Sequence, residues 1–167
     1  MSDEEKRAWL EQAMAQWETS LLRLCFAYLH DASLAEDAVQ ETFLKAWKGC
    51  GRFRREAEER TWLMRIAINT CKDMMKSAYF RHTDRSAGLD QLPEIACAFT
   101  PADDTVTRAV MNLPPRYREV VLLRWMQGLT GDETARALHL PRSTVYHRLK
   151  KAQRMLKQAL EEWYHAE

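Results

Sequence analysis

Residues 129–154, LTGDETARALHLPRSTVYHRLKKAQR, contain two short helical segments separated by a tight break. The first segment is predicted to begin at Thr130, because Thr130 and Glu133 form the Thr-x-x-Glu pattern of a capping box. The turn is expected at residues 139–140. Pro141 suits the first turn of the next helix, because its missing N–H would have had no partner there. This outline is typical of a helix-turn-helix that reads duplex DNA.

The second of these helices has an apolar face and a basic face. Val145, Leu149, Ala152 and Leu156 recur at helical spacing, and we expect them to be buried. The opposite face carries the side chains that a major groove would meet, namely Ser143, Tyr146, His147, Lys150, Lys151 and Arg154. A solvated basic surface helix has the same pattern, so the motif needs support from the rest of the chain.

The composition is that of a folded protein. The chain has 167 residues, of which 46% are apolar, and this suffices for one domain or two small ones. No stretch approaches the roughly 20 apolar residues that a membrane-spanning helix requires. The acidic start, MSDEE, lacks the basic end and the apolar run of a signal peptide. The sequence therefore predicts a cytoplasmic protein with no direct membrane insertion.

Residues that could carry catalytic or metal chemistry are scattered along the chain. The four cysteines, at positions 25, 50, 71 and 97, form no Cys-x-x-Cys pair and have no histidine at zinc-finger spacing. We expect reduced, mainly structural thiols, with Cys50 and Cys97 more exposed than the other two. The sequence also has no glycine-rich phosphate loop and no nucleophile elbow. It therefore predicts no enzyme activity, no metal site and no cofactor.

The formal net charge of +1 conceals four blocks of alternating sign. Residues 1–50, 51–86, 87–104 and 105–167 carry net charges of −4, +4, −4 and +5. Basic blocks suit the phosphate backbone of nucleic acids, whereas acidic blocks suit a basic protein surface or a solvated face. An uneven scatter of surface charge is the alternative explanation for any single block.

Helical periodicity covers most of the chain, and no β alternation interrupts it, so we predict an all-α fold. Apolar residues at helical spacing mark a helix around residues 13–28, a second helix behind a Ser33-x-x-Glu36 capping box, and a third that begins near Trp62. The pattern weakens from Tyr79 to Asp104 and then resumes. The prediction is two small helical bundle domains joined by a flexible linker, with the first domain at 1–78, the linker at 79–104 and the second domain at 105–167.

Several stretches resemble one family in their order and spacing. They are DASLAEDAVQETFLKAW (31–47), FR (53–54), TWLMRIAIN (61–69) and LPPRYREVVLL (113–123), followed by the helix-turn-helix. Together they resemble the extracytoplasmic-function (ECF) sigma factors, the smallest members of the bacterial sigma-70 family. The resemblance extends over residues 17–160. It implies a subunit that binds core RNA polymerase and recognises the minus-ten and minus-35 elements of promoters.

In that family, the helix with the Glu-Asp-x-x-Gln-Glu-x-Phe pattern docks on the coiled coil of the polymerase clamp. The resemblance implies polymerase-binding residues at Asp37, Gln40, Glu41, Leu44 and Trp47. A face that mixes carboxylates, an amide and large apolar side chains suits a protein interface with a basic rim. Phe43 and Ala46 are expected to serve the core instead.

The segment that follows corresponds to the part of the family that opens the minus-ten element and holds an extruded base. The implied contacts are Arg52, Phe53, Arg54, Arg55, Arg65, Asn69 and Lys72. Single-stranded DNA requires cations along its backbone and flat side chains that accept unstacked bases. Trp62 either joins this set or lies in the core. Arg55, Ala57 and Glu59 stand where the family commonly has a glycine, a serine and an aromatic residue, so the base preference is not carried over.

In the helix-turn-helix, TVYHRL (144–149) matches the Thr-Val-x-x-Arg-Leu core of the family's minus-35 reader. The implied contacts are Arg142, Ser143, Thr144, Tyr146, His147, Lys150, Lys151 and Arg154. Tyr146 and His147 replace the family's frequent arginine and serine, which indicates a different base preference. Lys150 and Arg154 suit phosphate contacts, whereas Arg148 suits either a phosphate or a salt bridge that packs helices.

The sequence therefore predicts a sigma factor that binds the clamp and flap of core RNA polymerase, binds promoter DNA and initiates transcription. The resemblance further implies a stress or envelope-type regulon and control by an anti-sigma factor. A stand-alone helix-turn-helix repressor or activator is the alternative, although it explains the C-terminal half alone.

Overall fold

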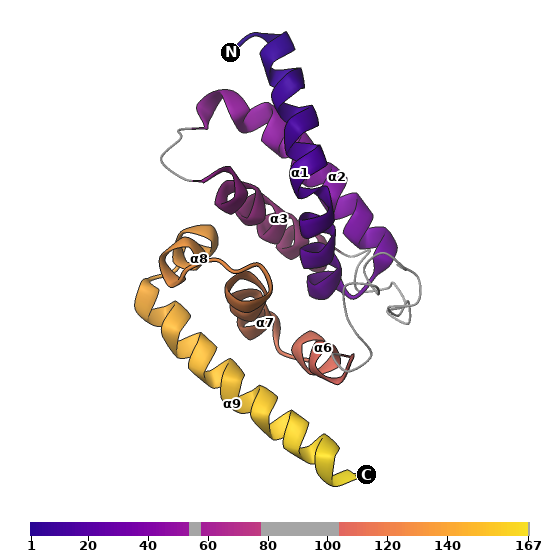
Figure 1. The fold of residues 1–167 in the computed structure, drawn as a ribbon, viewed down its shortest axis with the longest axis vertical. Coiled ribbons are helices and arrows are strands. Elements are labelled where there is room, and N and C mark those ends of the chain that lie inside the picture. The colour runs from indigo at the N-terminus through magenta and orange to yellow at the C-terminus, as the bar shows by residue number, and fades with distance from the viewer. Residues whose placement is uncertain (54–57, 78–103, 167) are drawn as a thin grey trace.

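The structure, a computed structural model, describes residues 1–53, 58–77 and 104–166. Within these ranges every regular element is helical, which confirms the predicted all-α fold (Figure 1). The N-terminal helices are α1 (Asp3–Leu29), α2 (Ala32–Gly49), the 3₁₀ turn η1 (Cys50–Arg52) and α3 (Glu59–Lys76). The C-terminal helices are α6 (Asp104–Met111), α7 (Pro115–Val121), the π-helical turn η4 (Leu122–Met126), α8 (Gly131–Leu138) and α9 (Arg142–Ala166).

The N-terminal helices pack through the apolar stripes that the sequence predicts, and each of α1, α2 and α3 contacts the other two. The buried side chains include Ala13, Leu21, Leu24 and Tyr28 of α1, Leu34, Ala38, Phe43 and Ala46 of α2, and Leu63, Met64, Ala67 and Ile68 of α3. Burying a Leu, Ile, Phe or Met side chain contributes about 1.5–3 kcal/mol relative to leaving it exposed. These stripes therefore supply most of the energy that holds the three helices together.

The start of α2 differs from the prediction. Asp31, not Ser33, is the N-cap residue, and its Oδ1 accepts a hydrogen bond from the N–H of Leu34 at 2.9 Å. The predicted Ser33-x-x-Glu36 capping box is wrong because the Asp31 carboxylate already satisfies a first-turn donor and lies at the positive end of the helix dipole. Ser33 and Glu36 are exposed residues within the helix.

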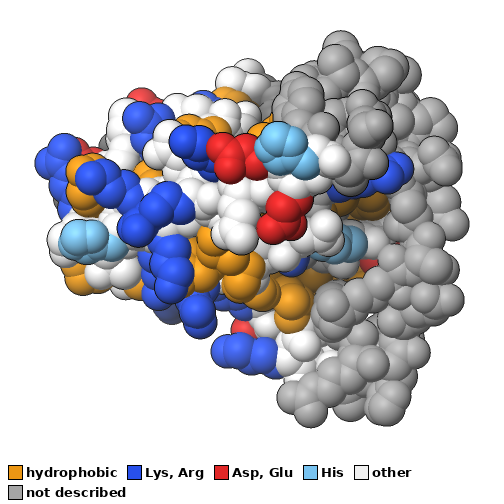
Figure 2. Space-filling view, turned by 90° about the horizontal axis from the view of Figure 1, so that it is seen from below, with side chains coloured by type: hydrophobic (Ala, Val, Ile, Leu, Met, Phe, Trp, Pro, Cys, Tyr) orange, Lys and Arg blue, Asp and Glu red, His pale blue; other side chains and the backbone are white. Residues whose placement is uncertain are grey.

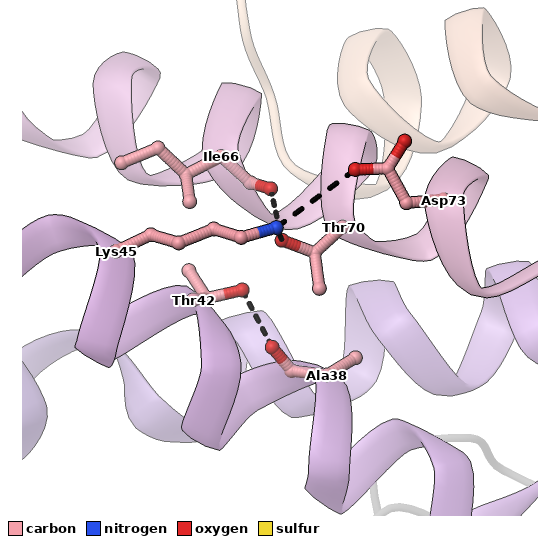
Figure 3. Close-up of polar contacts among 6 residues, drawn as sticks. All are labelled: Ala38, Thr42, Lys45, Ile66, Thr70 and Asp73. Atoms are coloured by element: carbon pink, nitrogen blue, oxygen red, sulfur yellow. Dashed lines mark hydrogen bonds and ion pairs between the residues drawn. The ribbon is translucent and has the colours of Figure 1, made fainter.

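Polar contacts between α2 and α3 fix the rotation of α3 (Figure 3). The Nζ of Lys45 donates to Thr70 Oγ1 at 3.1 Å and lies 3.9 Å from Asp73 Oδ2. Thr70 in turn donates to the carbonyl of Ile66 at 2.8 Å. Because Lys72 follows Thr70 by two residues, it projects from the opposite side of α3, away from α2.

The C-terminal helices follow the predicted helix-turn-helix closely. The α7 helix continues into η4, after which Gly128 adopts a left-handed φ of 69°. Thr130 Oγ1 accepts a hydrogen bond from the N–H of Glu133 at 3.1 Å, as the capping pattern predicts. His139, with a φ of 53°, ends α8 at the expected turn. The predicted linker lies outside the described residues, except that Asp104 already begins α6.

The two groups of helices also share one apolar core, which the sequence did not predict. Leu122, Leu123 and Leu129 are fully buried and belong to the same cluster as the stripes of α1, α2 and α3. α8 packs on α3 (Figure 1), and α7 and η4 contact α1. The C-terminal helices are therefore seated against the N-terminal helices.

Hydrogen bonds also cross this boundary. Gln127 Nε2 donates to the carbonyl of Ser20 at 3.1 Å. The guanidinium of Arg118 donates to the carbonyl of Tyr28 at the end of α1, and it also donates to the carbonyl of Leu113 at 2.9 Å. One arginine thus joins the end of α1 to the segment that precedes α7.

Cys25, Cys50 and Cys71 are buried free thiols. Cys50 is more exposed than Cys25 and Cys71, as expected, but at 6% against 0% it is still buried, and its Sγ donates to the carbonyl of Trp47 at 3.1 Å. Contact with Cys25, together with burial, raises the pKa of Cys71 well above its ordinary value. Because the thiolate is the reactive form, this thiol is suited to packing and not to chemistry. Cys97 lies outside the described residues.

Candidate nucleic-acid and protein interfaces

The basic face of α9 lies where the sequence predicts it. Val145, Ala152 and Leu156 are buried and Leu149 is half-buried, because α9 packs on α6, α7 and α8. The predicted contact residues on the outer face are exposed, namely Arg142, Ser143, Tyr146, His147, Lys150, Lys151 and Arg154, whereas Thr144 is half-buried. Figure 2 shows Lys and Arg side chains gathered on the side of the molecule that lies away from the grey residues.

Tyr146 is the central side chain of this face and is 54% exposed. The Nζ of Lys150 lies 4.8 Å from the centroid of the Tyr146 ring, and the His147 ring meets it nearly edge-on at 5.8 Å. An exposed cation–π contact contributes about 0.5–1 kcal/mol. It holds an aromatic ring and a cation side by side, so that the ring can meet base edges while the cation meets a phosphate.

Arg142 and Arg148 differ in the burial of their acidic partners. Arg142 Nε lies 3.4 Å from Asp132 Oδ1, and both side chains are exposed, so this ion pair is weak and exchangeable. Arg148 Nη1 lies 3.5 Å from Oε1 of Glu119, whose side chain is 4% exposed. This contact favours the helix-packing role for Arg148.

Sequence reasoning missed Arg124 and Trp125. They line a pocket of about 410 Å³ together with Arg142, Tyr146 and Lys150. Trp125 stands in an apolar run, yet it is 49% exposed. The π-helical geometry of η4 changes the rotation of the residues along it, and a 3.6-residue period does not anticipate that change.

The predicted minus-ten residues lie on η1 and on one face of α3. Arg65, Asn69 and Lys72 follow the i, i+4, i+7 spacing of a single helical face. Asn69 is exposed, whereas Arg65 and Lys72 are half-buried. On η1 and directly after it, Arg52 is exposed and Phe53 is half-buried. The predicted contacts Arg54 and Arg55 lie outside the described residues.

Trp62 serves the packing beneath this surface. Its ring centroid lies 4.7 Å from that of Phe53 and 6.0 Å from that of Trp9. It also packs on Gly49, where an added Cβ would come within 3.3 Å of the Trp62 ring. These contacts favour the core role for Trp62, and they hold Phe53 in place at the surface.

Glu59 is a structural residue that the sequence did not reveal. Its two carboxylate oxygens accept hydrogen bonds from the indole N–H groups of Trp9 at 2.9 Å and Trp17 at 3.0 Å. The partners are 50 and 42 residues away, so no local pattern could indicate them. These hydrogen bonds join the start of α3 to α1. Glu59 stands at the position where an aromatic residue is common in the resembled family.

Lys72 is paired with a buried carboxylate of the C-terminal helices. Its Nζ lies 3.0 Å from Oε2 of Glu119, and the two side chains are 32% and 4% exposed. Burial raises the pKa of Glu119, although Lys72 and Arg148 act in the opposite direction. The cation predicted to contact DNA is therefore occupied within the chain.

A groove of about 550 Å³ runs between α1 and α2. It is lined by Val39, Gln40, Phe43, Leu44 and Trp47 of α2 and by Arg7, Leu10, Met14 and Glu18 of α1. Leu44 is 55% exposed, and Asp37, Gln40 and Glu41 are also exposed, whereas Trp47 is half-buried. The structure brings these predicted residues onto one face of α2. The sequence missed the α1 wall, although Leu10 and Met14 are four residues apart and share a helical face.

Within the described residues, no group of three or more His, Cys, Asp or Glu side chains could hold a metal ion. The helices in these same ranges include none that is long and apolar enough to cross a membrane.

Comparison with known sequences gives consistent matches over both groups of helices. Residues 14–81 match the sequence model of the Sigma-70 region 2 family, and residues 103–156 match that of Sigma-70, region 4. The chain is 30% identical to the RNA polymerase sigma-H factor of Pseudomonas aeruginosa, over 94% of this chain and 88% of that protein. It is 31% identical to the ECF RNA polymerase sigma factor SigM of Mycobacterium tuberculosis, over 90% of this chain and 76% of SigM.

Solved structures share the fold. CnrH, in complex with the cytosolic domain of CnrY, superposes with a TM-score of 0.72 at 24% identity, covering 93% of this chain and 90% of CnrH. RpoE, in complex with the anti-sigma factor NepR from Bartonella quintana, gives a TM-score of 0.71 at 19% identity, covering 90% and 96%.

Proposed function

Because the chain belongs to the extracytoplasmic-function sigma factors of the sigma-70 family, we propose that three of its surfaces divide the work of promoter recognition. The protein directs core RNA polymerase to specific promoters and initiates transcription there. In our proposal, the groove between α1 and α2 binds polymerase, α3 acts on the minus-ten element and α9 recognises the minus-35 element. The observation that carries this assignment is that each motif has exposed residues on a different helix, namely Leu44 on α2, Asn69 on α3 and Tyr146 on α9.

The groove between α1 and α2 is suited to a helical segment of the polymerase clamp. Leu44 and Met14 offer exposed apolar surface, while Asp37 and Glu41 add negative charge on the same side of the molecule. An apolar centre beside a charged rim is the usual composition of a specific protein interface. The flap is expected to contact the C-terminal helices.

The outer face of α9 is suited to the major groove. Tyr146 and His147 are placed to contact base edges, whereas Lys150 and Arg154 are placed to neutralise phosphates. On the other DNA surface, Arg52, Phe53 and Asn69 provide a cation, a ring and an amide for single-stranded DNA.

We further propose that an anti-sigma factor controls the protein. CnrH and RpoE, which share this fold, are bound in their structures to the cytosolic domain of CnrY and to the anti-sigma factor NepR. A partner helix in the α1–α2 groove would compete directly with polymerase. This assignment further implies a stress or envelope-type regulon, action in the cytoplasm, no catalysis by the chain itself and no cofactor.

The test of the groove is Leu44→Arg, measured by co-elution with core RNA polymerase. We expect at least about tenfold weaker binding, because an exposed apolar anchor is replaced by a cation at the centre of the interface. Gln12→Arg is the matched control, since Gln12 is an exposed residue of α1 that does not line the groove and lies two residues from both Leu10 and Met14, on the opposite side of the helix.

If Leu44→Arg bound core RNA polymerase as tightly as the control variant does, the polymerase site would lie outside the groove. If the wild-type chain bound no core polymerase yet protected a duplex operator alone, the alternative of a stand-alone helix-turn-helix regulator would replace the proposal. A sigma factor of this type requires the core enzyme for strong and specific binding to promoters.

A further inference from the structure

The first turn of α3 is held from α1. The N-cap residue Glu58 makes no side-chain capping hydrogen bond. The next residue, Glu59, instead accepts hydrogen bonds from the indole N–H groups of Trp9 at 2.9 Å and Trp17 at 3.0 Å, one on each carboxylate oxygen. Hydrogen bonds to a charged acceptor are stronger than those between neutral groups. The position of this turn therefore depends on two tryptophans of α1.

The same contacts continue to the surface. The Trp9 ring centroid lies 6.0 Å from that of Trp62, and Trp62 lies 4.7 Å from the ring of Phe53. On its other side Trp62 packs on Gly49, where an added Cβ would come within 3.3 Å of the ring. Close packing of this kind limits the orientations that each ring can adopt. A continuous series of contacts thus leads from the Glu59 carboxylate to Phe53, which is half-buried.

Trp17 is held at its edge and at its face. Glu59 accepts the hydrogen bond of its indole N–H, and the guanidinium of Arg60 lies 5.9 Å from the ring centroid. Both charged side chains are half-buried. A carboxylate that leaves water requires hydrogen-bond donors, and each Glu59 oxygen has one. Two successive residues of α3 therefore fix one indole of α1.

We propose that Glu59 is a positioning residue for recognition of the minus-ten strand. By holding Trp9 and Trp17, it sets the first turn of α3. Through Trp62, it holds the Phe53 ring in the orientation that accepts an unstacked base. Glu59 itself does not touch DNA. This inference rests on the proposed function in one respect, namely that Phe53 meets single-stranded minus-ten DNA.

A purely structural role for Glu59 predicts a different result. Loss of a structural contact lowers stability and weakens all activities together, whereas loss of a positioning residue weakens binding of the minus-ten strand selectively. Asp31→Ala is the matched control, because it also removes a hydrogen bond to a carboxylate in the N-terminal helices. Asp31 caps the start of α2, whereas the series of contacts described above begins at the opposite end of that helix, at Gly49.

The first experiment records the indole N–H signals of the full chain by nuclear magnetic resonance, with ¹⁵N-labelled tryptophan and assignment by single Trp→Phe variants. Glu59→Gln should move the signals of Trp9 and Trp17 upfield, because the charged acceptor is lost. The signal of Trp62 should move as well, since its ring packs on Trp9. The signal of Trp125, on η4, should stay unchanged and serves as the internal reference.

The second experiment measures binding of the holoenzyme, formed with core RNA polymerase, to a fluorescein-labelled single strand. The strand is the non-template minus-ten segment of a promoter identified by run-off transcription. Glu59→Ala should bind about five- to tenfold more weakly than the wild type, the lower part of the range for loss of one stacked base. Glu59→Gln, which keeps one acceptor oxygen, should lose about threefold. Asp31→Ala should bind as the wild type does, and all three variants should bind core polymerase within about twofold of the wild type.

A double-mutant cycle tests whether Glu59 acts through Phe53. Phe53→Ala removes the ring, so Glu59→Ala in that background should cause less than about twofold further loss of strand binding. A full five- to tenfold further loss would mean that Glu59 acts by another route, and it would overturn the proposal.

Three other results would also overturn it. They are wild-type strand binding by Glu59→Ala, an equal loss in Asp31→Ala, and an unmoved Trp62 signal in Glu59→Gln. In each of these cases the wild-type holoenzyme still binds the strand, so the proposed function stands. If the wild-type holoenzyme does not bind the strand, the assignment of the minus-ten surface fails and this inference fails with it.

Discussion

At the scale of single residues, Glu119 joins α7 to two other helices. Its buried carboxylate contacts Lys72 of α3 and Arg148 of α9. We expect Glu119→Ala to lower the free energy of unfolding by about 2–3 kcal/mol, less than for a fully buried pair because both cations are partly exposed. Asp132→Ala, which breaks an exposed pair with Arg142, should cost about 0.5 kcal/mol. Urea unfolding measures both, and equal losses would show that the Glu119 contacts add nothing.

The burial of Glu119 also predicts a pH dependence. Its pKa in the folded chain is raised above the ordinary 4.5, so the folded chain binds this proton more tightly than the unfolded chain does. The resulting stability is fully present below the ordinary pKa and is lost as the pH rises through the raised pKa. Relative to Glu119→Gln, which cannot titrate there, the wild-type free energy of unfolding should therefore decrease from below pH 4.5 toward neutrality. A relative increase would mean that the pKa is lowered.

Two neighbouring side chains on α9 should have separable effects on DNA. Lys150→Ala should weaken binding to all promoters and reduce the slope of log affinity against log salt by about one, because one phosphate contact is lost. His147→Ala should change base preference within the minus-35 box by about 1–3 kcal/mol and leave the salt slope unchanged. Quantitative binding of the holoenzyme to a promoter library, repeated at several salt concentrations, measures both effects. Loss of folding in both variants would contradict the assignment of this face as exposed.

At the scale of elements, the cap of α2 distinguishes the structure from the sequence pattern. Asp31→Ala should cost about 1 kcal/mol of stability, because the N–H of Leu34 loses its acceptor. Ser33→Ala should cost almost nothing, since Ser33 is an exposed residue inside the helix. Thermal unfolding of the two variants measures both losses of stability. A larger loss for Ser33→Ala than for Asp31→Ala would support the Ser33 capping box instead.

The elements that the sequence predicted well depend on local chemistry. The turn at His139, the Thr130 cap and the apolar stripe of α9 follow from residues within one or two helical turns of each other. Trp125 and Glu59 were missed for physical reasons of two kinds. The exposure of Trp125 depends on a π-helical turn that breaks the usual helical period. The structural role of Glu59 depends on two indole partners that are far away in the sequence.

At the scale of the whole molecule, the sequence predicted the two groups of helices but not their association. The sequence pattern of Leu122, Leu123 and Leu129 predicts burial, but it is the same whether their side chains pack among the C-terminal helices or against the N-terminal helices. The contacts of Gln127 with Ser20 and of Lys72 with Glu119 pair residues that no periodic pattern relates. Such pairings depend on the assembled shape of both groups.

The central claim is that this whole chain confers promoter specificity on RNA polymerase. The most direct measurement is run-off transcription in vitro, with the purified full-length chain, bacterial core polymerase and a library of promoter fragments, and with core polymerase alone as the control. We predict new, defined start sites that appear only when the chain is present and that share sequence elements upstream at the minus-ten and minus-35 positions. Transcripts identical to those of core polymerase alone, together with no co-elution of the chain with core, would contradict the claim.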